Sequence, residues 1–311
     1  MKKLISIVIP AYNEEEVIDE LAKRLKAVMD ASVKYDFEVI IIENGSTDLT
    51  FQKLIKVNKN DSRFKIIRLS RNFTSDGGSA AGLKFTKGDA AVIMNADLQD
   101  PPEMIPEFIK KWEEGYEIVY GIIQKRKGIA ITRSLASVLF YELINRLTSG
   151  LFPKNVGNFR LIDKKVYYAV NEFPERNKFL RGIIAWTGFS QTGIPYVRAE
   201  RFAGKSKANF SDVLRYALDA IYAFSYFPLR MISVIGIALS TGSFLAILIY
   251  VALFFLYGRQ VPGFTTLLTL MLFLFGMLFL LLGIMGEYLS RIYDEVKQRP
   301  NFIIKEKVGL E

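Results

Sequence analysis

Near the start of the chain, residues 4–14 read LISIVIPAYNE, an apolar run that ends in a proline and a polar turn. A short run rich in β-branched residues is typical of a strand that is buried on both faces of a parallel sheet. Tyr12, Asn13 and Glu14 would then follow the carboxyl end of that strand, where open α/β sheets bind their ligands. A signal peptide is the competing interpretation, but the apolar run is short and acidic residues follow it at once.

Three further runs of the same kind occur at residues 37–43, 64–69 and 90–95. Between the first two strands, residues 14–32 place apolar side chains at helical spacing, which predicts an amphipathic helix. Two more helices are expected to begin at residues 48–50 and 101–103, the second with prolines in its first turn. This alternation of strands and helices predicts an α/β fold with a doubly wound, Rossmann-like sheet.

Polar turns follow three of the four strands, at residues 12–14, 43–46 and 95–100. Each turn alone indicates little, because Asn, Gly and Asp are ordinary turn residues. Neighbouring parallel strands would, however, bring all three turns to one edge of the sheet. There, Asp97 and the amide oxygens of Asn95 and Gln99 would offer the oxygen ligands that Mg²⁺ or Mn²⁺ prefers.

The composition limits both the partners and the chemistry. The 41 Lys and Arg residues exceed the 32 Asp and Glu residues, and the net charge of +9 suits anionic partners such as nucleotide phosphates, lipid phosphates and an acidic membrane surface. Nucleic acid is not expected as a partner, because no basic helix or aromatic nucleic-acid motif occurs. The chain has no Cys and no His. Acid–base and metal chemistry must therefore use carboxylates, amides, hydroxyls and cations.

Two segments near the C-terminus, residues 232–257 and 264–286, contain no charged residue. Each is long enough to cross a hydrocarbon core of about 30 Å, which predicts two transmembrane helices. A pair of buried core helices is the alternative in a soluble protein, but two such helices could hardly both be covered in a chain of this size. Basic residues flank the pair on both sides, so both termini and the catalytic domain are expected on the cytoplasmic side of the cytoplasmic membrane.

The chain is thus expected to have four parts. A cytoplasmic domain at residues 1–209 precedes an interfacial helix at 210–228, a transmembrane hairpin at 229–288 and a cytoplasmic tail at 289–311. Tyr and Phe are frequent in the interfacial segment, as is typical of a helix lying in the membrane surface. Residues 135–147 are expected to form either a second interfacial helix or an ordinary packed helix.

The polar turns carry a specific resemblance. Residues 7–14 (IVIPAYNE), 43–48 (ENGSTD) and 96–103 (ADLQDPPE) resemble the signature blocks of family 2 glycosyltransferases. Within that family the chain is most similar to the polyprenyl-phosphate group, which includes dolichol-phosphate mannose synthases and bacterial undecaprenyl-phosphate glycosyltransferases. The likeness extends to residues 286–293 (GEYLSRIY). It implies a GT-A catalytic domain that transfers a sugar, with inversion and metal assistance, from a nucleotide-sugar to a polyprenyl phosphate, and UDP-sugars are favoured as donors.

The resemblance also implies a role for individual residues. The donor would contact Pro10, Tyr12, Glu14, Glu43, Asn44, Asp97 and Lys207. Mg²⁺ or Mn²⁺ would be bound by Asn95, Asp97 and Gln99. The acceptor phosphate would contact Arg126, Arg133 and Ser137. The catalytic set would be Asp97, Asn158 and Arg160.

The sequence departs from the family pattern at several of these positions. Asn44, Asn95 and Asn158 stand where the family usually has Asp, Ile123 where many relatives have Arg, and Thr74 where many have Gly. The acceptor is already an anion near neutral pH, so transfer does not need a strong general base. A catalytically impaired pseudoenzyme or scaffold of the same fold remains the alternative. A processive polysaccharide synthase is not favoured, because the Gln-x-x-Arg-Trp block is absent; association into a homo-oligomer is left open.

Overall fold

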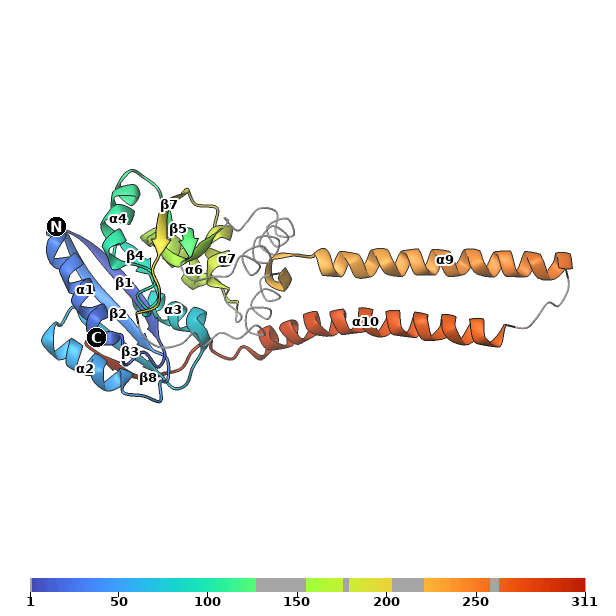
Figure 1. Cartoon of the computed structure of the whole chain (residues 1–311), viewed down its shortest axis with the longest axis horizontal. Helices are drawn as coiled ribbons and strands as arrows, with labels where there is room; N and C mark the ends of the chain where they lie inside the picture. Colours follow the sequence, from blue (N-terminus) through green and yellow to red (C-terminus); the bar gives the residue numbers. More distant parts are fainter. Residues whose placement is uncertain (1, 127–154, 176–178, 203–220, 258–262, 311) are drawn as a thin grey trace. The chain divides into compact units, whose positions relative to one another are not determined.

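The computed structural model describes residues 2–126, 155–175, 179–202, 221–257 and 263–310 (Figure 1). These residues divide into two compact units. The first unit comprises Met1–Ala220 and Arg299–Glu311, and the second comprises Ile221–Gln298. The segment predicted at 135–147, and most of the predicted interfacial helix at 210–228, lie outside the described residues.

The first unit is built on one sheet, whose described strands lie in the order β7-β5-β6-β4-β1-β2-β3-β8 (Figure 1). The strands are β1 (Lys3–Ala11), β2 (Tyr35–Glu43), β3 (Phe64–Leu69), β4 (Ala90–Ile93), β5 (Ile118–Arg126), β6 (Val156–Asp163), β7 (Gln191–Arg198) and β8 (Ile304–Val308). The helices of this unit are α1 (Ile18–Ala31), α2 (Thr50–Asn60), α3 (Thr74–Phe85), the 3₁₀ turn η1 (Pro102–Met104), α4 (Ile105–Glu113), α6 (Lys164–Glu172) and α7 (Leu180–Trp186).

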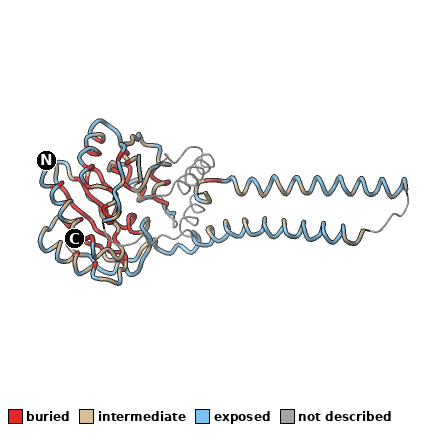
Figure 2. Tube along the Cα trace, viewed as in Figure 1, coloured by how far each residue is buried: buried red, intermediate tan, exposed pale blue. Residues whose placement is uncertain are grey.

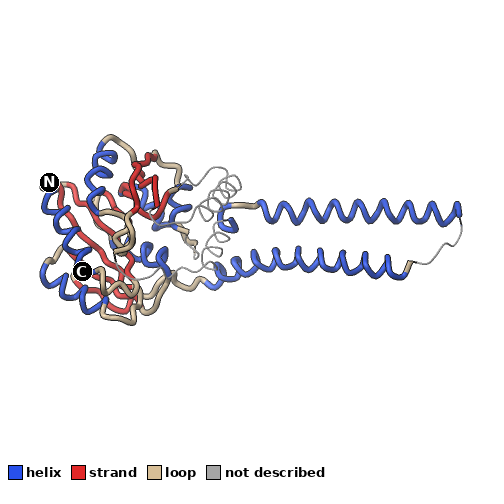
Figure 3. Tube along the Cα trace, in the orientation of Figure 1, coloured by secondary structure: helices blue, strands red, loops and turns tan. Residues whose placement is uncertain are grey.

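The predicted α/β class is confirmed, and each of the four predicted strands is present. β1 pairs in parallel with β2 and β4, and β2 pairs in parallel with β3. The sheet, whose strands are red in Figure 3, is nevertheless mixed. β6 runs antiparallel to β4 and β5, and β8 runs antiparallel to β3. The parallel half therefore brings the carboxyl ends of β1, β2 and β4 to one edge.

The core lies on both faces of β1. Ile5, Ile7, Val8 and Ile9 are fully buried, as expected for a strand covered by helices on both sides. On one face, α3 approaches so closely that a β-carbon on Gly82 would meet the side chains of Val8 and Ile42. A β-carbon on Gly78, nearer the start of α3, would lie 3.0 Å from Pro10 Cβ, which places this part of the helix beside the carboxyl end of β1.

The second unit contains two long apolar helices, α9 (Phe227–Tyr257) and α10 (Phe264–Lys297). By length and composition, Phe227–Leu253 and Thr266–Lys297 could each cross a membrane. Their apolar side chains are largely exposed, in contrast with the buried strands of the first unit (Figure 2). Helix α10 extends beyond the predicted end of the second span at residue 286.

The segment that follows α10 includes a strand that the sequence analysis did not predict. Ile304–Val308 forms β8, which pairs with β3 at the edge of the sheet. The backbone amide of Ser70 also donates a hydrogen bond to the carbonyl of Ile303 at 2.9 Å. Part of the predicted tail at 289–311 is thus an integral strand of the first unit.

Candidate active site

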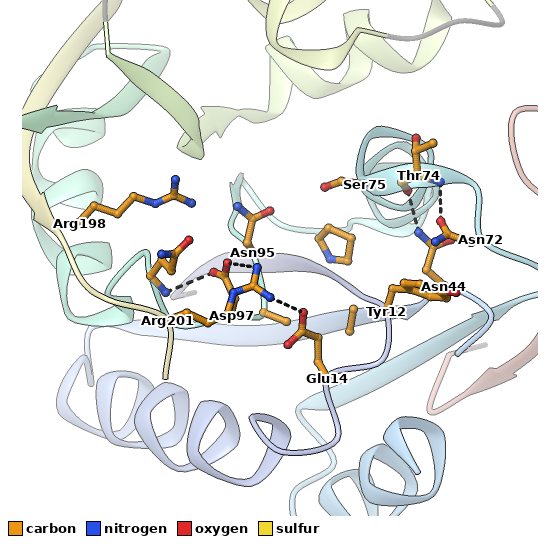
Figure 4. A pocket seen from close by; sticks show the side chains of 14 residues that line it. Tyr12, Glu14, Asn44, Asn72, Thr74, Ser75, Asn95, Asp97, Arg198 and Arg201 are labelled. Atoms are coloured by element: carbon orange, nitrogen blue, oxygen red, sulfur yellow. Dashed lines mark hydrogen bonds and ion pairs between the residues drawn. The ribbon is translucent and has the colours of Figure 1, made fainter. Parts of the chain in front are cut away.

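A pocket of about 380 Å³ opens at the carboxyl ends of β1, β2 and β4 (Figure 4). This is the edge at which open α/β sheets bind ligands. Its lining comes from the ends of β1, β2, β4 and β7 with the turns that follow them, from the loop between β3 and α3, and from the first turn of α3: Pro10, Ala11, Tyr12, Glu14, Asn44, Asn72, Thr74, Ser75, Asn95, Ala96, Asp97, Gln99, Arg198 and Arg201. Seven of the residues predicted for donor or metal binding therefore line one pocket.

The lining has two chemically different ends. Asn44, Asn72, Thr74 and Ser75 form an end that carries only uncharged polar groups (Figure 4). The opposite end holds charged groups, namely Asp97, Arg198 and Arg201, with Glu14 extending toward them (Figure 4). A neutral end suits a nucleobase or ribose, whereas a charged end suits a diphosphate and a cation.

Hydrogen bonds fasten the β1 turn to the β2 turn. The backbone amide of Asn13 donates to Ser46 Oγ at 3.0 Å, and Thr47 N donates to Asn13 Oδ1 at 2.8 Å. Glu14 N donates to Thr50 Oγ1 at 2.9 Å. Asn13 has a φ of 52°, a left-handed conformation that Asn tolerates better than most residues. These bonds fix the two turns to each other and hold Tyr12 and Glu14 in place at the pocket.

Glu43 stabilises the turn that follows β2 but does not line the pocket. Its side chain is fully buried, accepts a hydrogen bond from Ser46 N and lies 3.0 Å from Arg68 Nε. A buried carboxylate held by a backbone amide and a guanidinium stabilises a turn well. The contact between Glu43 and the donor stays a prediction.

Asn44 lines the neutral end and is bonded to the loop that precedes α3. Its Nδ2 donates to Thr74 O at 2.7 Å, and its Oδ1 accepts from Phe73 N at 2.9 Å. Thr74 has a φ of 67°, which is rare for a β-branched residue. The amide of Asn44 thus fixes the backbone around a strained residue of the pocket wall.

The charged end is built around Asp97, in the turn that follows β4. Asp97 Oδ1 accepts from Gln99 N at 3.3 Å, and Asp97 Oδ2 lies 3.0 Å from Arg201 Nη2. Asn95 Nδ2 donates weakly to Asp100 Oδ2 at 3.4 Å, and Gln99 Nε2 donates to Ala199 O at 3.4 Å. The three predicted metal ligands therefore lie on one turn.

This set of residues fits a magnesium or manganese ion. Within the described part of the chain, no group of three or more His, Cys, Asp or Glu residues could hold a metal. Mg²⁺, however, commonly takes only one or two protein carboxylates and completes its shell with water and substrate phosphates. Asp97, the amide oxygens of Asn95 and Gln99 and a diphosphate would provide such a shell.

Asp100 lies behind this turn and is only 2% exposed. Tyr196 donates its hydroxyl hydrogen to Asp100 Oδ1 at 2.6 Å, and Arg198 Nε lies 3.5 Å from the same oxygen. Burial raises the pKa of the Asp100 carboxyl, whereas the Arg198 charge and the Tyr196 hydroxyl act in the opposite direction. Asp100 therefore connects the turn that follows β4 to the end of β7.

The remaining predicted catalytic residues do not line the pocket. Asn158 and Arg160 belong to β6, where Arg160 is paired with Ile93 of β4. Arg160 is 5% exposed, and its Nη2 donates to Gly157 O at 2.8 Å. Ile123, where many relatives have Arg, is 5% exposed within the hydrophobic core.

Lys207, Arg133 and Ser137 lie outside the described residues. The backbone of Arg126 ends β5 and is in register with Arg198 of β7, but its side chain is not described. The sequence analysis assigned no site role to Arg198 or Arg201. Their position six to nine residues before Lys207, which the resemblance assigns to the donor, was the available signal for a site role.

The mixed α/β sheet is that of a GT-A-type fold. A solved structure of glucosyl-3-phosphoglycerate synthase from Mycobacterium tuberculosis, in complex with Mn²⁺, UDP and phosphoglyceric acid, shares this fold. It has a TM-score of 0.51 and 18% identity, covering 71% of this chain and 76% of that one. The chain belongs to glycosyl transferase family 2, whose sequence model matches residues 6–170.

Several relatives match almost the whole chain, including one from Bacillus subtilis and one from Shigella flexneri. The uncharacterized glycosyltransferase YkcC of Bacillus subtilis is 41% identical over 98% of this chain and 94% of the relative. The SfII prophage-derived bactoprenol glucosyl transferase of Shigella flexneri is 36% identical over 97% of both chains. The similarity therefore extends through the C-terminal apolar helices as well as the catalytic unit.

Proposed function

We propose that this glycosyltransferase moves a sugar from a nucleotide-sugar, with UDP-sugars favoured, to the phosphate of a polyprenyl lipid. The observation that carries the proposal is the two-ended pocket, in which a neutral end and an Asp97–Arg201 end lie within one cavity. Full-length similarity to a bactoprenol glucosyl transferase and the two apolar helices support a lipid acceptor.

In the proposed complex, the nucleoside lies toward Asn44, Thr74 and Tyr12, and the diphosphate lies toward Asp97. A bound Mg²⁺ or Mn²⁺ would neutralise the charge that develops on the departing diphosphate. Asp97 would hold the cation there, and Arg198 and Arg201 would supply further positive charge beside the diphosphate. Stabilising the leaving group in this way is the main electrostatic requirement of the reaction.

The reaction is one in-line displacement. An oxygen of the lipid phosphate attacks the anomeric carbon, the bond from that carbon to the diphosphate oxygen breaks, and the configuration inverts. Because the attacking oxygen is already anionic, no side chain has to remove a proton. The Asn158 substitution is therefore compatible with turnover, and Arg126, Arg133, Ser137 and Arg160 are the residues we assign to the acceptor side.

We infer that the reaction takes place at the cytoplasmic face of the membrane. The polyprenyl tail stays in the bilayer, because each buried CH₂ group contributes about 0.8 kcal/mol to its retention. The two apolar helices would keep the catalytic unit at the level of the lipid phosphate. The basic residues that flank both helices favour a cytoplasmic location for the catalytic unit.

The test is a lipid-extract assay with membranes that contain the full chain. The membranes are incubated separately with labelled UDP-glucose, UDP-N-acetylglucosamine and GDP-mannose plus Mg²⁺, and the label in the organic extract is measured. Asp97→Ala should abolish labelling while the protein stays folded in the membrane. Asp19→Ala, which removes an exposed carboxylate paired with Lys53, is the matched control and should label normally. If none of the donors labels the lipid in membranes supplied with polyprenyl phosphate, the result would favour the pseudoenzyme alternative.

A further inference from the structure

The end of β7 is joined to the proposed metal turn by hydrogen bonds and ion pairs. Ala199 N donates to Gln99 O at 3.2 Å, and Gln99 Nε2 donates to Ala199 O at 3.4 Å. These two bonds hold the backbone that leads to Arg201. The guanidinium of Arg201 then lies between two carboxylates, with Nη2 3.0 Å from Asp97 Oδ2 and Nη1 3.8 Å from Glu14 Oε1 (Figure 4).

This guanidinium interacts with the carboxylate that the proposed function assigns to a divalent cation. Asp97 has a side chain only 8% exposed, so its pairing with Arg201 is poorly screened by solvent. A cation that binds Asp97 Oδ2 directly must displace Arg201 or share the oxygen with it. Two positive charges on one carboxylate oxygen repel each other, so displacement is favoured.

The charge balance of the pocket favours the same conclusion. Asp97 is paired with Arg201, Asp100 faces Arg198 at 3.5 Å, and Glu14, the third carboxylate, lies 3.8 Å from Arg201. Asn95 adds no negative charge where the family usually has Asp. The two guanidiniums offset two of the three carboxylate charges, so a single net negative charge is left to attract a divalent cation before the donor binds. A nucleoside diphosphate brings new negative charge, to which both a cation and Arg201 can bind.

Building on the proposed function, we infer that Arg201 is an internal counter-cation that competes with the divalent metal for Asp97. Without donor, Arg201 neutralises Asp97 and keeps the metal affinity low. When the diphosphate arrives, Arg201 transfers to its oxygens and Asp97 becomes available to the metal. Metal and donor consequently bind together, and Arg201 acts as a positioning residue that enforces this coupling.

The experiment measures Mn²⁺ binding directly, from the electron paramagnetic resonance signal of free Mn²⁺, with the full chain in detergent. Without nucleotide, Arg201→Gln should bind Mn²⁺ about tenfold or more tightly than the unmodified protein. Arg24→Gln is the matched control, because Arg24 pairs with Glu103 on the exposed surface, and it should leave Mn²⁺ affinity unchanged. Arg201→Lys keeps the charge and should retain most of the competition. Equal Mn²⁺ affinities for Arg201→Gln and the unmodified protein would overturn the inference.

Two further measurements identify the site and protect against misfolding of the variant. The Mn²⁺ affinity gained in Arg201→Gln should be lost in the Asp97→Ala, Arg201→Gln double variant. If the double variant keeps the higher affinity, Arg201 and Mn²⁺ do not compete at Asp97. In the unmodified protein, saturating UDP should raise Mn²⁺ affinity at least tenfold, and equal affinities with and without UDP would also overturn the inference. Failure of lipid labelling with every donor would refute the proposed function, but it would not change the nucleotide-free comparison.

Discussion

Asn44 holds Thr74 in a left-handed backbone conformation. Asn44 Nδ2 donates to Thr74 O at 2.7 Å, and Thr74 has a φ of 67°. Both positions depart from the family pattern, in which Asp and Gly are usual. A carboxylate could not donate this hydrogen bond, so the two substitutions are physically coupled. Because Thr74 lines the pocket, the strain is stored at the proposed donor site.

Replacing Thr74 with glycine should therefore stabilise the protein. A left-handed conformation costs a non-glycine residue about 1–2 kcal/mol, and glycine adopts it freely. Allowing for the greater unfolded-state entropy of glycine, Thr74→Gly should raise the free energy of unfolding by about 1 kcal/mol. Denaturant unfolding in detergent measures this change, with Thr74→Ser as the control that keeps most of the strain. A less stable glycine variant would show that side-chain contacts of Thr74 outweigh its backbone strain.

Replacing Asn44 with aspartate should have the opposite effect. The carboxylate still accepts from Phe73 N, but its second oxygen carries no hydrogen that it could donate to Thr74 O. An unsatisfied carbonyl in this position costs about 1–3 kcal/mol, so Asn44→Asp should lower the free energy of unfolding by that amount. In the Thr74→Gly background the loop can relax, and the loss should be smaller. Equal losses in both backgrounds would show that the two positions are independent.

A buried ion pair away from the pocket should govern stability in acid. Glu38 is 2% exposed and lies 2.6 Å from Lys65 Nζ and 2.5 Å from Ser6 Oγ. Burial acts to raise the pKa of Glu38, but the hydrogen bonds from Lys65, Ser6 and the Lys87 amide hold it below its usual value of 4.5. A depressed pKa in the folded state stabilises the protein above pH 4.5, and this stability is lost as the pH falls through the lowered value.

Glu38→Gln should consequently lower the free energy of unfolding at pH 7 by about 2 kcal/mol, because hydrogen bonds to a charged group are lost. Its stability should also depend less on pH between pH 5 and pH 3 than that of the unmodified protein, as urea unfolding across that range would measure. Glu103→Gln is the control: its pKa is lowered by Arg24, but its side chain is 54% exposed. Solvent screening should keep that change below about 1 kcal/mol. Equal effects of the two substitutions would contradict a special role for Glu38.

The parallel half of the sheet could be predicted because local sequence determines it. β1, β2, β3 and β4 are short apolar runs, three of which end in predicted polar turns, and their observed positions agree with the predicted ones. β8 could not be predicted, because IKEKV is a short, charged edge strand that forms only by pairing with β3. Likewise, α3 could not be predicted, because its sequence is glycine-rich and has weak helical periodicity. Its position depends on the close packing of Gly82 against β1 and β2.

The same distinction applies to the site. Asn95, Asp97 and Gln99 lie within five consecutive residues, so a sequence motif alone indicates them. The contact between Arg201 and Asp97 joins residues 104 positions apart, and it exists only because β7 ends beside the β4 turn. The Asn44–Thr74 bond depends similarly on the loop between β3 and α3. Tertiary contacts between charged and polar groups leave no local pattern from which to predict them.

Asn95 should set the metal requirement of the reaction. Its amide adds no charge to the ligand set and lies 3.4 Å from Asp100 Oδ2 through Nδ2. Asn95→Asp places a second carboxylate beside Asp97 and opposite Asp100, and a hard divalent cation relieves that repulsion. The Mg²⁺ concentration for half-maximal lipid labelling should therefore fall about tenfold, equivalent to about 1.4 kcal/mol. Asn72→Asp makes the same charge change at the neutral end of the pocket and should leave the Mg²⁺ titration nearly unchanged. An identical titration for Asn95→Asp and the unmodified protein would mean that residue 95 does not face the ion.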